Sequence, residues 1–238
     1  MNVLPTDSRP RLRGEKAPLS RGAVIQAALT CLKRGSSALT MRAVAALLET
    51  GPGSLYVYVR DQRELHRLVL DSIASEVARQ APGADPTSRL VNLLMRYAGQ
   101  LLSYPGAAGL ALDHPPTGPS FLDLMEAALE LLVASGFSIN RASCAVDGLF
   151  LLVTGAMAEQ DARRLDEPAR SVGDLYAAAI DQEGPSRHPL LTAARPDAFE
   201  LGGGQRLEWM LRAFINGLAT APEPPQSGSN PGSGKDSP

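Results

Sequence analysis

The sequence predicts an all-α protein, and three observations support this prediction. Apolar residues make up 44% of the 238 residues, and alanine and leucine dominate among them. β-branched residues are sparse and nowhere alternate with polar residues over the length of a strand. Apolar residues recur instead at spacings of three and four, as on one face of a helix. This composition excludes wholesale disorder and fibrous repeats, and the length permits one or two domains.

The first predicted helix begins after Ser20, a favourable N-cap, and runs to about Arg34, where Gly35 ends it. Thr40 caps a short second helix, which the sequence Thr50-Gly51-Pro52-Gly53 breaks abruptly. The inward-facing residues of these two helices are Ile25, Ala28, Leu29, Leu32, Met41, Val44, Leu47 and Leu48.

Another short helix is predicted over Gly51 to Arg60, anchored by Leu55 and Val59. Asp61 then caps a helix over residues 61–79, and Glu64 three positions later resembles a capping box. Further helices are predicted over residues 87–104, 119–135, 138–163, 167–182 and 205–220, with a mobile loop over 184–204. The stretch Leu149 to Met157 is apolar on nearly every side, which predicts cover by its own domain and by another subunit.

Both ends of the chain are predicted to be disordered. Residues 1–19 form a basic arm, and residues 221–238 form a tail rich in proline, glycine and serine. The net charge of −2 hides an asymmetry, because residues 1–80 carry a net +5 and residues 81–238 a net −7. A basic first third suggests contact with a polyanion, although chance scatter of charge remains an alternative.

Several classes of protein are disfavoured by what the sequence lacks. The N-terminus has no apolar secretory segment, and the longest uncharged apolar stretch, Gly148 to Ala158, is about half a membrane span. Cys31 and Cys144 have no CxxC or histidine partner, which argues against zinc or disulfides and suits a reducing cytosol. The motifs GxSxG, HExxH, the Walker loop and GxGxxG are missing, so we expect no enzyme.

A capped short helix, a four-residue break and another short helix form a helix-turn-helix candidate. Leu55 and Val59 would anchor the second helix, and Pro52 and Gly53 leave its N-terminus bare enough to approach DNA closely. Arg42 can reach a guanine edge with its planar guanidinium. The alternative at this point is a purely structural helix pair with a glycine turn.

The segment from Leu19 to Ile73 resembles the DNA-binding domain of the tetracycline-repressor (TetR) family. The specific element is Leu55-Tyr56-x-Tyr58-Val59, followed by a charged turn and Glu64-Leu65. A fainter resemblance to the tetracycline repressor branch extends to about residue 220. Together the two resemblances imply a three-helix DNA-binding domain over residues 20–66 and a domain for effector binding and dimerisation over residues 67–220.

The resemblance also implies which residues meet DNA. Arg42 and the outer face of residues 52–58 would provide sequence preference, whereas Tyr56 and the start of the linking helix would contact phosphates. Gln62 lies where a lysine is usual, which removes a charge, and His66 is expected to be solvated or near phosphate. The full predicted set is Thr40, Arg42, Pro52, Gly53, Ser54, Tyr56, Tyr58, Arg60, Gln62 and Arg63.

The effector site is expected to be largely apolar. Its candidates are Leu93, Tyr97, Leu101, His114, Phe121, Met125, Phe150, Thr154 and Met157. For each of them ordinary core packing is an alternative. The polar residues that hold tetracycline in the repressor fall on Val77 or Ala78 and on Leu93 here. Glu159 and a single histidine do not make a metal site, so we expect neither magnesium nor a cofactor.

These observations predict a cytoplasmic homodimer with a four-helix interface built from residues 138–163 and 205–220. It would bind a palindromic double-stranded DNA operator, most simply as a repressor that a small apolar effector releases. Release would be a population shift in the spacing of two reading heads, transmitted by the helix over residues 61–79. The alternative is a helical small-molecule-binding or scaffold protein without specific DNA binding.

Overall fold

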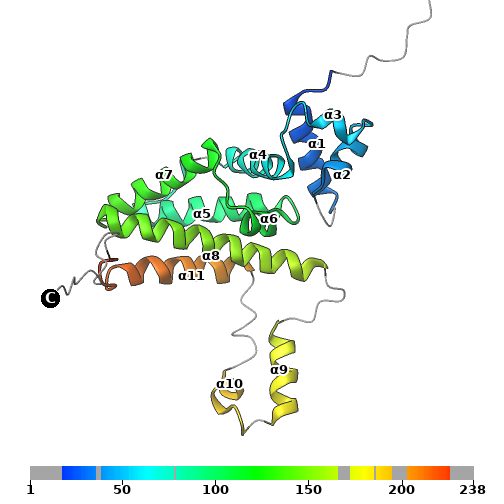
Figure 1. The fold of residues 1–238 in the computed structure, drawn as a ribbon. Helices are drawn as coiled ribbons and strands as arrows, with labels where there is room; N and C mark the ends of the chain where they lie inside the picture. Colours follow the sequence, from blue (N-terminus) through cyan, green and yellow to red (C-terminus); the bar gives the residue numbers. More distant parts are fainter. Residues whose placement is uncertain are drawn as a thin grey trace, which may run out of the picture.

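The computed structural model describes residues 18–35, 39–77, 79–165, 172–184, 186–194 and 203–225. All the regular secondary structure of these residues is helical, as predicted (Figure 1). The helices are α1 (Arg21–Lys33), α2 (Met41–Leu47), α3 (Pro52–Leu55), α4 (Gln62–Ser75), α5 (Pro86–Leu102), α6 (Ala107–Asp113), α7 (Pro119–Ala134), α8 (Ile139–Leu165), α9 (Val172–Glu183), α10 (Pro189–Ala193) and α11 (Gly203–Leu218). The predicted arm up to residue 17 and the tail from residue 226 lie outside the described residues.

Helices α1 to α3 form a small head, and the predicted caps hold its helix starts. The Ser20 hydroxyl accepts a hydrogen bond from the backbone of Ala23 at 3.1 Å, and the Thr40 hydroxyl accepts one from Ala43 at 3.2 Å. Such caps satisfy backbone N–H groups that have no partner within the helix. Helix α1 contacts α2 and α4, and α2 contacts α3, so the head is one packed unit joined to α4.

Helix α3 is shorter than the predicted Gly51 to Arg60. It covers one turn, and the backbone continues through turns in which Tyr58 and Val59 both donate to the Leu55 carbonyl. Leu55 is 0% exposed and Val59 1% exposed, as their spacing predicted. The two anchors therefore fix the segment even though regular helix ends at the first of them.

Helix α4 ends at Ser75, before the predicted residue 79. The apolar period Leu65, Val69, Ile73 and Val77 runs on through the turn, and all four side chains are buried. Glu76 and Val77 close the helix with bonds to carbonyls three residues back. The Glu76 carboxylate also accepts the Tyr104 hydroxyl at 2.6 Å. Val77 is buried although it lies beyond the end of α4, so the apolar period extends further than the helix and predicted too late an end.

The remaining helices form a body around α8. Helix α8 contacts α5, α6, α7 and α11, and Figure 1 shows it crossing the molecule between α5 and α11. By length and composition α8 could also span a membrane, but a core helix of a soluble protein passes the same test. Its packing against four helices is that of a core helix.

Two short helices were not predicted. Helix α6 begins after Gly106, whose φ of 84° favours glycine, and α10 lies inside the segment predicted to be a mobile loop. The loop prediction was wrong over residues 189–193, where a proline at the first position starts a single helical turn. Helices α9 and α10 contact each other and project away from the body (Figure 1).

The C-terminal tail was predicted to begin at residue 221, but residues 221–224 are bonded to the body. Arg141 donates to the carbonyls of Leu218 and Ala221, both at 2.9 Å. Asn140 donates to the Pro224 carbonyl at 3.2 Å. The start of α8 therefore fixes the chain just beyond α11.

The start of α4 joins the head to the body through His66. Its Nε2 lies 2.9 Å from the Leu39 carbonyl, and its ring centroid lies 5.1 Å from that of His114 after α6. His66 is only 5% exposed, so the prediction of a solvated or phosphate-facing histidine was wrong. Burial, and to a lesser extent His114, lower its pKa, whereas the Leu39 carbonyl and Asp113 oppose that shift.

We expect this junction to weaken on acidification. In the unfolded chain His66 takes up a proton near its ordinary pKa of 6.5, which the buried ring resists. The free energy of unfolding should therefore fall as the pH drops below about 6.5. His66→Gln, which keeps a donor for Leu39, should show a smaller loss of melting temperature between pH 7.5 and 5.5. His188→Gln, at the residue just before α10, should keep the loss of the parent, and equal curves for all three proteins would contradict the assignment.

Candidate DNA-binding surface and effector pocket

The predicted DNA-binding residues surround α3 at the outer end of the head. Arg42 on α2 is exposed, and so are Pro52, Gly53 and Ser54 at the start of α3. Tyr56, just after α3, is 54% exposed. Figure 1 shows α3 on the side of the head away from the body. This part of the predicted surface is therefore open to a large partner.

Other members of the predicted set already have protein partners. The Arg60 side chain donates to Glu64 at 3.1 Å, and the Gln62 side chain donates to the Leu39 carbonyl at 3.2 Å. The Thr40 hydroxyl serves as the cap of α2, and Tyr58 is half-buried against the core. Arg63 is exposed at the start of α4. The surface thus divides into free residues around Arg42 and Tyr56 and residues that position them.

Glu64 organises the turn that joins α3 to α4. It accepts the backbone N–H of Arg60 at 2.7 Å and the Arg21 guanidinium of α1 at 2.9 Å. These donors, the Arg60 N–H foremost, lower the pKa of Glu64. Asp61 meanwhile accepts the N–H of Glu64 at 2.8 Å, so the predicted capping box is present with its return bond shifted to Arg60.

Sequence reasoning missed Val57 as a surface residue. It is 80% exposed between the half-buried Tyr58 and the exposed Tyr56. Its position opposite the anchors Leu55 and Val59 was the signal that could have identified it. An exposed branched side chain beside polar ones is suited to apolar contact with a thymine methyl group.

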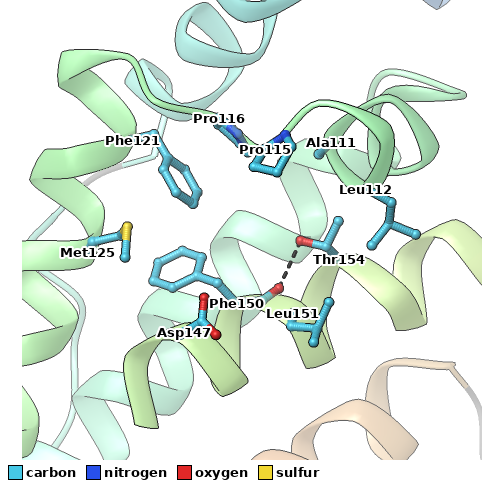
Figure 2. Close-up of a pocket in the computed structure, with 10 residues that line it drawn as sticks. All are labelled: Ala111, Leu112, Pro115, Pro116, Phe121, Met125, Asp147, Phe150, Leu151 and Thr154. Atoms are coloured by element: carbon cyan, nitrogen blue, oxygen red, sulfur yellow. Dashed lines mark hydrogen bonds between the residues drawn. The ribbon is translucent and has the colours of Figure 1, made fainter. Parts of the chain in front are cut away.

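A second candidate site is a cavity of about 290 Å³ within the body. It lies between α6 and the segment after it on one side and helices α7 and α8 on the other (Figure 2). Its lining consists of Ala111, Leu112, Pro115, Pro116, Phe121, Met125, Asp147, Phe150, Leu151 and Thr154. Of the predicted effector residues, Phe121, Met125, Phe150 and Thr154 line it. The rest of the lining was not predicted, because the sequence gives no sign that α6 approaches α8.

Three aromatic rings pack at the inner side of this cavity. The centroids of Phe121 and Phe150 are 5.0 Å apart, and Tyr97 lies behind them at 5.8 and 5.4 Å. Figure 2 shows the two phenylalanine rings at the open space, with Met125 beside them. Burial raises the pKa of Tyr97 to about 12, while Thr154 acts in the opposite direction. The cluster presents ring surfaces to any molecule in the cavity.

The other predicted effector residues lie elsewhere. Leu93, Leu101 and Met157 are no more than 2% exposed and belong to the core, which was the alternative for each. His114 contacts His66 and lines a separate polar cavity of about 280 Å³ with the arginines of the α4 start. None of these four residues lines the cavity of about 290 Å³ beside Phe121 and Phe150, which is called the aromatic cavity below.

The described residues hold no group of three histidine, cysteine or acidic side chains able to bind a metal ion. Glu159, the acidic position considered above, pairs instead with Arg163 and Arg206. The carboxylate of the cavity itself is that of Asp147, which lies at its edge (Figure 2).

Comparison with known proteins identifies the family of the chain. Residues 82–221 match the family described as tetracyclin repressor-like, C-terminal domain. Tetracycline repressor protein class D of Escherichia coli is 31% identical over 206 residues, covering 83% of this chain and 90% of that protein. The transcriptional repressor DrrR1 of Streptomyces coeruleorubidus is 32% identical over 160 residues, covering 65% and 58% of the two chains.

Among solved structures, the TetR family protein ActR of Streptomyces coelicolor, in complex with actinorhodin, superposes with a TM-score of 0.75. It is 28% identical, and the match covers 86% of this chain and 97% of that chain. TetR-family regulators are DNA-binding dimers that respond to small-molecule effectors. This chain belongs to the TetR family of ligand-responsive, DNA-binding transcriptional regulators.

Proposed function

We propose that this chain is a cytoplasmic, homodimeric repressor that binds a palindromic operator through α2 and α3. An aromatic, largely apolar molecule in the cavity beside Phe121 and Phe150 releases it from DNA. The observation that carries the proposal is the placement of α4, which contacts both the head and the walls of the cavity. The proposed activity is binding alone, without a catalytic step.

The DNA-binding part rests on the exposed residues of the head. Arg42 would read a guanine edge, and Val57 would read a thymine methyl group. Tyr56 and Arg63 would contact phosphates, which fixes register without sequence information. Arg60 and Gln62 would act by position, because Glu64 and the Leu39 carbonyl hold their side chains.

The dimer rests on apolar side chains exposed along α8 and α11. Trp209 is 65% exposed, Phe214 37%, Leu151 61% and Ile139 62%. Large apolar side chains that are exposed on α8 and α11 are of the kind that interfaces cover. Pairing of α8 and α11 with their mates would place two heads on DNA, where successive major grooves are about 34–36 Å apart.

The effector part rests on the lining of the cavity. A volume of about 290 Å³ is close to the lower end of ordinary ligand pockets. Two phenylalanine rings, a methionine and two prolines favour a planar, apolar molecule. The relatives include a structure of ActR with actinorhodin and a TetR variant from Acinetobacter baumannii with minocycline. Both support a ligand role for the corresponding domain here.

The first experiment is selection of bound sequences from random duplex DNA, followed by a screen for compounds that release them. Retained preference at physiological salt supports the proposal, because nonspecific binding depends on phosphate charge and weakens steeply with salt. If the protein binds compounds but enriches no DNA sequence, it is instead a helical small-molecule-binding or scaffold protein without specific DNA binding.

Arg42→Ala should weaken binding to the selected site by about 1–3 kcal/mol and relax preference at one base pair. The reason is loss of a guanidinium that forms paired hydrogen bonds with a guanine edge. Fluorescence anisotropy on the selected site and on single-base variants measures this. Arg96→Ala in the body is the control and should change neither quantity. Equal weakening on every sequence would show that Arg42 contacts only phosphate.

Phe214→Asp should produce a monomer with poor DNA affinity, because a charge would be buried in the proposed interface. Light scattering gives the mass, and the same anisotropy assay gives the affinity. Leu122→Asp on α7, where the native leucine is 55% exposed, is the matched control and should remain dimeric. A Phe214→Asp protein that stays dimeric would contradict the assigned interface.

A further inference from the structure

Helix α7 is capped by a carboxylate that belongs to another helix. Gly118 precedes α7 and supplies no side-chain cap, and Pro119 occupies the first position. Asp71, on α4, accepts the backbone N–H of Phe121 at 3.1 Å and the Ser120 hydroxyl at 3.3 Å. The N–H of the third helical residue is one that an N-cap side chain ordinarily binds. Asp71 therefore acts as the N-cap of α7, a role that the residue directly before the helix has elsewhere in this chain.

Gly118 allows this contact by having no side chain. It is buried, and a Cβ built on it would overlap the carboxyl group of Asp71. Its φ of −76° is open to other residues, so the close approach of α4, and not backbone conformation, requires glycine here. Asp71 and Gly118, which are distant in sequence, are thus both needed for the contact between α4 and the start of α7.

Asp85 provides an internal comparison. It precedes its own helix, α5, and accepts the N–H and the hydroxyl of Ser88, both at 2.8 Å. The chemistry is that of Asp71, namely one backbone N–H and one serine hydroxyl. Local capping would therefore have satisfied the start of α7. A cap from α4 adds a connection between two helices that a local cap does not give.

That connection lies between the aromatic cavity and the DNA-binding head. The Phe121 ring lines the cavity and packs on Phe150, while its N–H is bonded to α4. Helix α4 then runs to Gln62 and His66, both of which lie within hydrogen-bond distance of the Leu39 carbonyl in the head. The path from the cavity wall to the head therefore consists of the hydrogen bond of Asp71 and the helix α4.

We propose that Asp71 is the positioning residue that couples the effector cavity to the DNA-binding head. A molecule that widens the cavity displaces Phe121 and the start of α7, and the Asp71 carboxylate makes α4 follow. Without that bond α7 moves alone, so the molecule still binds but DNA is retained. This inference rests on the proposed function and identifies how its two sites are linked.

The effector is unidentified, so the test uses a tethered probe. Met125→Cys places a thiol on the cavity wall, Cys144→Ser removes the exposed cysteine, and Cys31 is buried. Labelling with N-phenylmaleimide then holds an aromatic group at the cavity. We expect the label to weaken binding to the selected DNA at least about 10-fold, a common size for allosteric coupling. With Asp71→Ala added, the label should change affinity less than about 3-fold.

Three further variants separate coupling from stability. Asp85→Ala removes an equivalent cap and should keep the full effect of the label. Asp71→Asn retains an oxygen for the Phe121 N–H and should keep most of it. Gly118→Ala displaces the carboxylate without altering it and should behave as Asp71→Ala does. A full label effect in Asp71→Ala would overturn the proposal, as would its loss in Asp85→Ala.

A second measurement needs no DNA. Hydrogen exchange of the α4 amides should change on labelling in the parent and in Asp71→Asn, but not in Asp71→Ala or Gly118→Ala. If selection enriches no DNA sequence, the proposed function fails, while this measurement still decides whether Asp71 couples the cavity to α4. Exchange in α4 that the label leaves unchanged in the parent would overturn the coupling itself.

Discussion

The carbonyl of Leu39 is the point on which the arrangement of the two sites depends. It lies between α1 and α2, and the side chains of Gln62 and His66 approach it from the first turns of α4. Because His66 is buried, its contact is shielded from water and is stronger than a surface hydrogen bond. The head is thereby fixed in orientation to α4, and a rotation of α4 becomes a rotation of α2 and α3.

A second contact fixes the other end of the head to the body. Lys33, in the last turn of α1, lies 4.7 Å above the ring of Tyr104, whose hydroxyl donates to Glu76 at the end of α4. Such a cation–π contact at a partly exposed site contributes on the order of 0.5–1 kcal/mol. The head is thus held near both ends of α4, and movement of one end alone would strain the other contact.

Local chemistry made much of this fold predictable. Ser20, Thr40 and Asp61 each cap the helix that the sequence assigned to them, because a cap depends on residues within one turn. Features that depend on distant contacts were not predictable. Asp71 caps a helix that lies 50 positions later in the sequence, and no spacing rule identifies such a pair. His66 was misjudged from its neighbours Arg63 and Arg67, although its helical phase with Leu70 and Ile73 placed it on the buried face.

The effector residues show a related limit. Leu93 and Phe121 both lie on inward faces, and apolar periodicity indicates burial without distinguishing a packed neighbour from a cavity. The difference arises from α6, a short helix whose start is fixed by Asp161 of α8 through the N–H of Gly106 at 3.0 Å. The segment that follows α6 supplies Pro115 and Pro116 to the cavity wall. The wall therefore exists because of a contact that no local pattern encodes.

The packing of α8 also determines which wall can yield to a ligand. Phe150 and Thr154 face the cavity, while Gly148 packs against Phe214 of α11, where a Cβ would lie 3.0 Å from the ring. Helix α8 is thus closely backed by α11, and packed interiors resist compression. Under the proposed mechanism, a molecule that widens the cavity therefore displaces the opposite wall, which is α7 and the segment before it. That wall is bonded to α4 through Asp71, so under the proposed coupling its displacement is passed along α4 toward the DNA-binding head.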